Sequence, residues 1–136
     1  MLNASLIADL VTDLPGPVRW QKLVTSLRHY FSCGAVVLLR KEEDSLRPIA
    51  QQGLVKDALG RHFQLAQHPR LAMLCRSREA IRFEPDSPLP DPYDGLIEAL
   101  PNQHLAVHGF MGMSLYIEGS LWGALTLDSL EPGTFT

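Results

Sequence analysis

The sequence predicts an α+β domain in which helices cover a central antiparallel sheet. Three observations support this fold class. Two stretches with helical spacing open the chain at residues 2–14 and 17–31, and a short apolar run follows at residues 34–39. A long alternating segment at residues 105–117 then precedes a second strand at residues 121–128. Amphipathic helices beside such strands form a layered domain around one core.

Length and charge narrow the class of protein. The chain has 136 residues, which suits a single domain that buries about two-thirds of its unfolded surface. Its formal net charge is −3, so no strongly basic surface is available for phosphate groups. We therefore expect one domain over residues 1–136 that does not bind nucleic acid directly.

The chain shows no targeting or membrane signal. No apolar run reaches membrane-spanning length, and the first residues lack the basic flank of a signal peptide. The two cysteines, Cys33 and Cys75, form no Cys-x-x-Cys pair and are expected to be reduced thiols. These features predict a cytoplasmic location.

The first half of the chain alternates between helical and strand patterns. The helix at residues 2–14 is expected to stop at Pro15-Gly16-Pro17, and the next helix is expected over residues 17–31. A buried strand follows at residues 34–39. Residues 42–45 form the predicted turn, and residues 46–52 form the returning strand.

The middle of the chain contains a third predicted helix. Residues 53–61 connect to it, and the helix itself is expected over residues 69–78 with Leu71, Leu74 and Cys75 inward. Arg70 and Arg76 are six residues apart and thus not on one helical face, so we do not expect them to form a single anion clamp. A short strand is expected at residues 79–83, and a polar loop after it.

Two carboxylates lie in a stiff, proline-rich turn. Residues 89–96 have the sequence Leu-Pro-Asp-Pro-Tyr-Asp-Gly-Leu, in which Pro90 and Pro92 restrict the backbone on both sides of Asp91. Asp91 and Asp94 have the spacing of a metal or ligand site. They also fit the start of a brief helix over residues 92–100, with Asp91 as its N-cap, and spacing alone favours that cap.

The final hairpin decides which side chains share a face of the sheet. If residues 118–120 all belong to the loop, Asp128 lies opposite Phe110 and diagonal to His108. A loop of two residues would turn Asp128 to the other face. A lone histidine in a strand is usually structural, but a histidine beside an aspartate on the neighbouring strand is a stronger signal. Together with Asp91 and Asp94, the pair would give oxygen and imidazole donors for a divalent metal such as iron(II) or manganese.

Several segments together resemble one known family. They are His-Pro-Arg-Leu at residues 68–71, the proline-rich turn at 89–96, Val-His at 107–108, Gly-Ala-Leu-Thr-Leu-Asp at 123–128 and the connection at 53–61. This set resembles the amino-terminal GAF sensor domain of the NorR family of nitric-oxide-responsive, sigma-54-dependent transcription activators, over nearly the whole chain. The resemblance implies a central antiparallel sheet, helices on one face and a ligand pocket under loops on the other. It also implies a truncated terminal helix, with ATPase and helix-turn-helix domains beyond residue 136.

The family resemblance further implies a mononuclear non-haem iron site. The family's iron ligands are the two aspartates of Asp-Pro-Tyr-Asp, a His and a Cys two residues apart, and an Asp ending the next strand. The matching residues here are Asp91, Asp94, His108 and Asp128, whereas Phe110 replaces the cysteine.

Two further residues belong to the expected ligand pocket. By resemblance Arg70 lies at the metal, and because a guanidinium stays protonated we expect it to steer or hydrogen-bond a bound ligand. The Phe110 ring would occupy the space that a thiolate ligand and a bound gas molecule would share. Three outcomes are therefore open: iron(II) held by the remaining ligands with water, a different metal or small molecule, or a cavity filled by Phe110 with nothing bound.

These expectations give one leading function and two alternatives. The leading function is a sensor that binds nitric oxide at iron and then releases an intramolecular AAA+ ATPase domain from repression. No nucleophile with a placed base is evident, so we do not expect an enzyme. The first alternative is a metal-free interaction or homodimerisation module, or a sensor of another small ligand. The second is an oxygen-using iron enzyme, which the absence of a second histidine disfavours.

Overall fold

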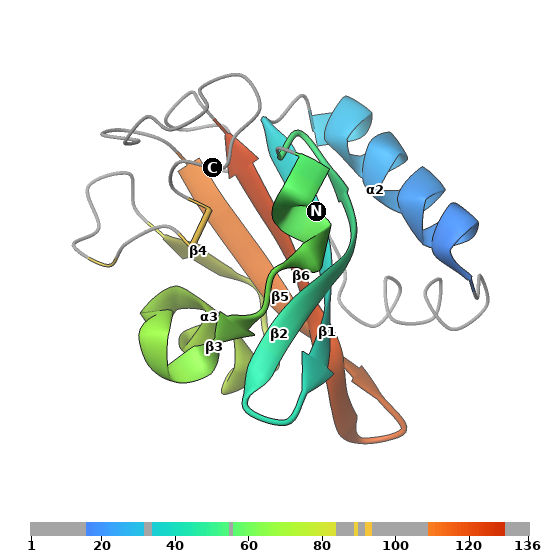
Figure 1. Ribbon diagram of the computed structural model, residues 1–136. Helices are drawn as coiled ribbons and strands as arrows, with labels where there is room; N and C mark the ends of the chain where they lie inside the picture. The colour runs from blue at the N-terminus through green and yellow to red at the C-terminus, as the bar shows by residue number, and fades with distance from the viewer. Residues whose placement is uncertain are drawn as a thin grey trace.

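The computed structural model describes residues 16–31, 34–54, 56–83, 89, 92–93 and 109–129. Within them, an antiparallel sheet has the strand order β3-β2-β1-β6-β5-β4 (Figure 1). The helices are α2 (Pro17–Phe31) and α3 (Pro69–Cys75), with short 3-10 helices η1 (Lys56–Gly60) and η2 (Leu65–Gln67). The strands are β1 (Ala35–Glu42), β2 (Ser45–Gln52), β3 (Phe63–Gln64), β4 (Ile81–Phe83), β5 (Gly109–Ile117) and β6 (Ser120–Ser129). The predicted α+β class is confirmed.

The two faces of the sheet carry separate cores. Figure 1 shows α2 on one side of the sheet and α3 on the other. Val24 of α2 packs with Leu38 of β1, Met113 of β5 and Leu125 of β6. On the opposite face, Leu71 and Leu74 of α3 belong to a cluster whose strand residues include Val37, Leu39 and Phe110. Strand alternation sends successive side chains to these two cores.

Helix α2 has the predicted bounds, whereas α3 is shorter than predicted. It ends at Cys75 and not at Arg78. In a longer helix the Glu79 N–H would donate to the Cys75 carbonyl, but here it donates to Ser77 Oγ over 3.1 Å. The Cys75 carbonyl instead accepts from the Tyr116 hydroxyl of β5 over 3.3 Å. A serine side chain thus competes with the helical pattern and ends the helix.

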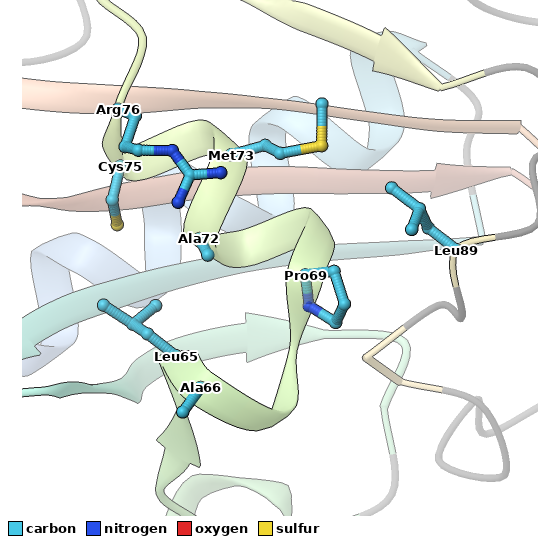
Figure 2. A pocket seen from close by; sticks show the side chains of 8 residues that line it. All are labelled: Leu65, Ala66, Pro69, Ala72, Met73, Cys75, Arg76 and Leu89. Atoms are coloured by element: carbon cyan, nitrogen blue, oxygen red, sulfur yellow. The ribbon is translucent and has the colours of Figure 1, made fainter.

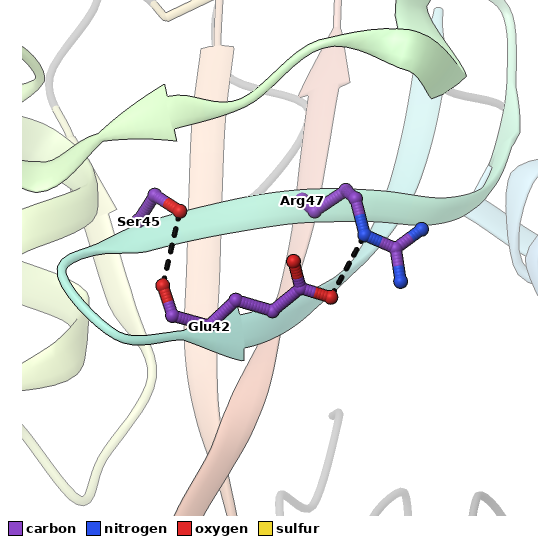
Figure 3. A network of polar contacts seen from close by, with 3 residues as sticks. All are labelled: Glu42, Ser45 and Arg47. Carbon is purple, nitrogen blue, oxygen red and sulfur yellow. Dashed lines mark hydrogen bonds and ion pairs between the residues drawn. The ribbon is translucent and has the colours of Figure 1, made fainter.

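The first hairpin is tighter than the sequence suggests. Strand β1 continues through Glu42 and β2 begins at Ser45, so only Glu43 and Asp44 form the turn. Ser45 Oγ donates to the Glu42 carbonyl over 3.0 Å, and Arg47 Nε donates to Glu42 Oε2 over 2.8 Å (Figure 3). The ion pair is partly exposed, so it adds little stability, and the backbone pairing holds the hairpin.

The β5–β6 hairpin corrects one prediction and confirms another. Its loop has two residues, Glu118 and Gly119, because Ile117 pairs with Ser120. Both loop residues have positive φ, 53° and 81°, as tight turns between twisted strands require. A bulge between Leu115 and Tyr116 then shifts the register, so Asp128 still pairs with Phe110 as predicted.

Other predicted elements lie outside the described residues. They are the helix at residues 2–14, Cys33, most of the loop at residues 84–90, residues 105–108 of the long strand, and everything after Ser129. Within the described part of the chain, no helix is both long and apolar enough to span a bilayer.

Candidate functional site

Three of the predicted site residues lie among those described, and all three are buried. The exposed fractions are 0% for Phe110, 1% for Asp128 and 3% for Arg70. The remaining predicted ligands, Asp91, Asp94 and His108, lie outside the described residues, and their roles stay predictions.

Asp128 lies near the end of β6, between two neighbouring strands. It pairs with Ala35 of β1 on one side and with Phe110 of β5 on the other. Leu127 belongs to the α2 core, so alternation directs Asp128 to the α3 face, the face on which Phe110 packs. The structure therefore brings Asp128 and Phe110 together in one buried layer.

Phe110 belongs to an aromatic cluster that fills this layer. The cluster comprises Phe63, Phe83, Tyr93 and Phe110. Edge contacts join Phe83 to Phe110 with ring centroids 5.5 Å apart and Phe63 to Tyr93 at the same separation, and a tilted contact joins Tyr93 to Phe110 at 6.4 Å. Such pairs add attraction beyond the burial of their apolar area. The ring at position 110 is thus a fixed part of the core.

Arg70 is an internal partner of that cluster. Its guanidinium carbon lies 5.1 Å from the Phe83 ring centroid and 5.0 Å from that of Phe110, within range of cation–π attraction. Its Nε donates a hydrogen bond to the Leu89 carbonyl over 3.0 Å. The sequence predicted a contact with ligand but missed these protein partners. Arg76, the residue that follows α3, is exposed, whereas Arg70 is buried, so the two side chains do not share one face.

The residues on the two sides of Asp91 contact α3 and the sheet, respectively. Arg70 binds the Leu89 carbonyl before it, and the fully buried Tyr93 follows it. The Tyr93 hydroxyl shares a hydrogen bond of 2.8 Å with Thr126 Oγ1 of β6. The sequence analysis missed Tyr93 and Thr126 as site residues, although Thr126 stands two residues before Asp128 and so shares its face of the sheet.

The backbone at this turn differs from the prediction. A helix was expected to begin at Pro92, but Pro92 and Tyr93 form a turn, and residues 94–100 of the expected helix lie outside the described residues. The Tyr93 ring packs against Phe63 and Phe110 at this point. The rest of the expected helix stays a prediction.

The described residues do not fit a thiolate-bearing iron centre. Position 110 offers a phenyl ring, which has no donor atom, and that ring is held among other side chains. Among the residues that the structure describes, no three His, Cys, Asp or Glu side chains are grouped to hold a metal ion. Asp128 supplies one carboxylate of the expected set, a donor that suits hard divalent metals.

A groove lies on the outer side of α3 (Figure 2). Its volume is about 570 Å³, and it is lined by Leu65, Ala66, Pro69, Ala72, Met73, Cys75, Arg76 and Leu89. Neither Asp128 nor Phe110 contributes to this lining. Burial raises the pKa of the Cys75 thiol, against the lowering effect of Lys41 and Arg76. The thiol form is therefore favoured at neutral pH, and Cys75 lines a groove to which the predicted site residues Asp128 and Phe110 do not contribute.

Comparison with known families identifies the domain type. The family model described as GAF domain matches residues 18–136 of this chain. The match covers every described helix and strand of the sheet except the first residue of α2.

Curated relatives share extensive sequence identity with the chain. It is 59% identical over 130 residues to the nitric oxide reductase transcription regulator NorR2 of Cupriavidus necator, covering 96% of this chain and 25% of that protein. It is 42% identical over 132 residues to the anaerobic nitric oxide reductase transcription regulator NorR of Shigella flexneri, covering 97% of this chain and 26% of that protein. The chain thus spans about a quarter of the length of these relatives.

Solved structures with low sequence identity share the fold. The GAF domain of a phosphoenolpyruvate-protein phosphotransferase from Coxiella burnetii superposes with a TM-score of 0.66 at 21% identity, covering 85% of this chain and 67% of that one. The corresponding Acinetobacter domain also gives 0.66, at 14% identity, covering 100% and 83%. These similarities establish the fold.

Proposed function

The chain belongs to the GAF family, and from that premise we propose that it is the signal-sensing domain of a nitric-oxide-responsive transcription regulator of the NorR type. The relatives named above support the regulator class. The observation that carries the proposal is that Asp128 is buried in the α3-facing layer of the sheet, into which Tyr93 of the proline-rich turn also packs, while Arg70 binds Leu89 at the start of that turn. A buried carboxylate in the layer that this turn enters suits recognition of a ligand, whereas no described group is arranged for turnover.

The proposed metal ligands are Asp91, Asp94, His108 and Asp128, and the proposed metal is non-haem iron(II). Because Phe110 gives no thiolate, these oxygen and imidazole donors would bind iron(II) more weakly than a set that includes sulfur. When bound, iron(II) would supply the position at which nitric oxide coordinates.

Tyr93 provides the proposed route from the turn to the rest of the protein. Its hydroxyl contacts Thr126, two residues before Asp128 and three before the end of β6. A displaced turn would weaken this hydrogen bond and alter the end of β6. The chain would lead from there to the proposed AAA+ ATPase and helix-turn-helix domains. A ligand that binds the displaced state better shifts the population toward it and so relieves repression.

The test uses the full-length regulator, with transcription from a nitric-oxide-dependent reporter as the output. Asp128→Asn should abolish the response, and Tyr93→Phe should reduce it by removing the hydroxyl contact with Thr126. Asp44→Asn, in the exposed turn of the first hairpin, serves as the matched control and should respond normally. An unchanged response in Asp128→Asn would reject the proposal.

A second candidate is a metal-free GAF module for protein interaction or homodimerisation, or for another small ligand. The packing of Phe110 among aromatic rings favours it, because the ring occupies the donor position. Metal analysis of anaerobically purified protein separates the candidates. Iron that disappears in Asp91→Ala or His108→Ala, with a nitrosyl absorption band on exposure to nitric oxide, supports iron-based sensing. Absence of metal after reconstitution supports the module.

The remaining features of the proposal follow from the regulator class. A transcription regulator acts where the DNA is, so the proposed location is the cytoplasm. DNA contact belongs to the proposed helix-turn-helix domain and not to this chain.

A further inference from the structure

The guanidinium of Arg70 is buried against two adjacent aromatic rings. Its central carbon is 5.1 Å from the Phe83 ring centroid and 5.0 Å from the Phe110 ring centroid, and only 3% of the residue is exposed. Phe83 and Phe110 pair directly across β4 and β5, so both rings rise from the same face of the sheet. The guanidinium therefore lies against a platform made by two neighbouring strands.

A buried arginine requires compensation, because the guanidinium stays charged at any physiological pH. Here the ring faces and the Leu89 carbonyl provide it in part. Asp128 pairs with Phe110 across β5 and β6, which places a carboxylate in the layer that holds the guanidinium. The positive charge of the Arg70 guanidinium thus lies in the same buried layer as the Asp128 carboxylate.

Helix α3 holds Arg70 from a fixed position. Leu74 packs so closely on β5 that a Cβ added at Gly112 would lie 2.4 Å from Leu74 Cδ1. Beyond the helix end, Ser114 Oγ donates to the Ser77 carbonyl, and the Tyr116 hydroxyl donates to that of Cys75. Because both the middle and the end of α3 are attached to β5, Arg70 at its start has little freedom to move.

We propose that Arg70 is a metal-independent latch, a positioning residue that holds the chain at Leu89 to α3 through the Leu89 carbonyl while Phe83 and Phe110 fix its guanidinium. This contact needs no bound ligand. Phe110 serves as one wall of the latch, which gives the residue at the missing thiolate position a definite role. This inference stands apart from the proposed sensing function.

The first test compares Arg70→Met with Arg76→Met in the 136-residue chain, with and without a strong chelator. Both changes replace an arginine of the same segment by a long apolar side chain, but Arg76 is exposed. Arg70→Met should lower the melting temperature by about 5 °C or more, and Arg76→Met should change it little. Chelator should leave the wild-type value unchanged. Equal melting of the two variants, or a chelator-dependent loss in the wild type, would overturn the latch.

A second measurement separates positioning from general stability. Backbone hydrogen exchange in a peptide covering residues 89–96 should accelerate about tenfold or more in Arg70→Met, while a peptide within β5 keeps its protection. Arg70→Lys should not restore slow exchange, because an ammonium lacks the planar face that a guanidinium presents to the rings. Full restoration by Lys would show that charge alone suffices and would contradict the proposed geometry.

A third variant keeps the proposal testable if Arg70→Met fails to fold. In the wild type, the Arg70 Nε–H should give an NMR signal that is protected from solvent exchange and shifted by ring currents. Phe110→Leu should remove much of that shift, whereas Met113→Leu, on the opposite face of β5, should leave it unchanged. An Arg70 signal that Phe110→Leu leaves unchanged would refute the latch. If all three measurements support the latch but the full-length regulator does not respond to nitric oxide, only the proposed function is refuted.

Discussion

At the scale of single residues, Phe110 determines what the buried layer can bind. A cysteine at this position would offer a charged, soft donor next to the carboxylate of Asp128. The phenyl ring instead contacts Phe83, Tyr93 and the guanidinium of Arg70. A phenyl ring at this position therefore contributes packing energy and no donor atom for a metal.

Replacing Phe110 with cysteine should raise iron binding. The variant regains a thiolate beside Asp128, and we expect it to retain about one iron per chain after anaerobic reconstitution, more than the wild type retains. Elemental analysis with absorption spectroscopy gives the measurement. Met113→Cys, a buried position on the other face of β5, should show no such gain; a gain there would mean that any cysteine in the strand suffices.

His68 makes the folding stability of the domain depend on pH. Burial lowers its pKa from the ordinary value of 6.5, so the unfolded chain takes up a proton more readily than the folded one. Well above pH 6.5 the histidine is neutral in both states and does not change the free energy of unfolding. As the pH falls below 6.5, the free energy of unfolding decreases, and the decrease is complete once the pH is below the lowered pKa of the folded state.

His68→Gln should reduce the loss of stability on acidification. The free energy of unfolding, measured by urea titration at about pH 7.5 and about pH 5.5, should fall less in the variant than in the wild type. Loss of the ring contact with Phe63 lowers both values alike and cancels in the comparison. His62→Gln, at an exposed position, is the control, and a wild-type slope in His68→Gln would contradict the expectation.

At the scale of elements, the contact of α3 with β5 fixes the position of the helix that lines the groove. Gly112 lets the helix approach, because a side chain there would meet Leu74 Cδ1 at 2.4 Å and the Leu125 carbonyl at 3.3 Å. Leu74 is fully buried, so it has little room to move aside. The glycine is required by close packing and not by a turn.

Gly112→Ala should destabilise the domain by about 1–3 kcal/mol, because overpacking displaces α3 from the sheet. Chemical denaturation measures this change directly. Gly60→Ala is the matched control, since a Cβ there meets nothing within 4 Å. Adding Leu74→Ala should make room, so the double variant should cost less than the sum of the single ones; strict additivity would show that the two sites do not clash.

At the scale of the whole molecule, the sheet separates an α2 core from the α3 layer that holds the candidate site, and strand register assigns each residue to one of them. The bulge in the β5–β6 hairpin places Trp122 as an extra residue, since Tyr116 pairs with Leu121 and Leu115 pairs with Gly123. In a regular hairpin with the same two-residue loop and no bulge, Asp128 would pair with Gly109. The bulge therefore keeps the carboxylate in the α3 layer.

Deleting Trp122 should preserve the register, because the pairs on either side of the bulge then follow without interruption. The deletion should cost about as much stability as Trp122→Ala, through loss of the edge contact with Trp20 at 6.1 Å. Thermal melting compares the two. Deleting Ala124 keeps Asp128 opposite Phe110 only if the bulge is lost, which puts Trp122 in the place of Gly123. A Cβ at that place would lie 2.0 Å from the Leu39 carbonyl oxygen, so this deletion should unfold the domain. Unfolding on deletion of Trp122 would show that the bulge itself is required.

Much of the architecture follows from local patterns in the sequence. The bounds of α2, the strands of both hairpins and the burial of Leu71 and Leu74 depend on apolar spacing, which is a property of neighbouring residues. The pairing of Asp128 with Phe110 was also predicted, although through a three-residue loop that the structure does not have. The shorter loop shifts the strand register by one residue, and the bulge shifts it back.

The sequence by itself determined the fold class, the family resemblance and the absence of a cysteine at position 110. Only the tertiary structure decided that Arg70 turns inward onto Phe83 and Phe110, and that Tyr93 reaches Thr126. These contacts join segments 13 to 40 residues apart, and no local spacing encodes them. They form because a charged group and a hydroxyl, once buried, must find partners wherever the folded chain supplies them.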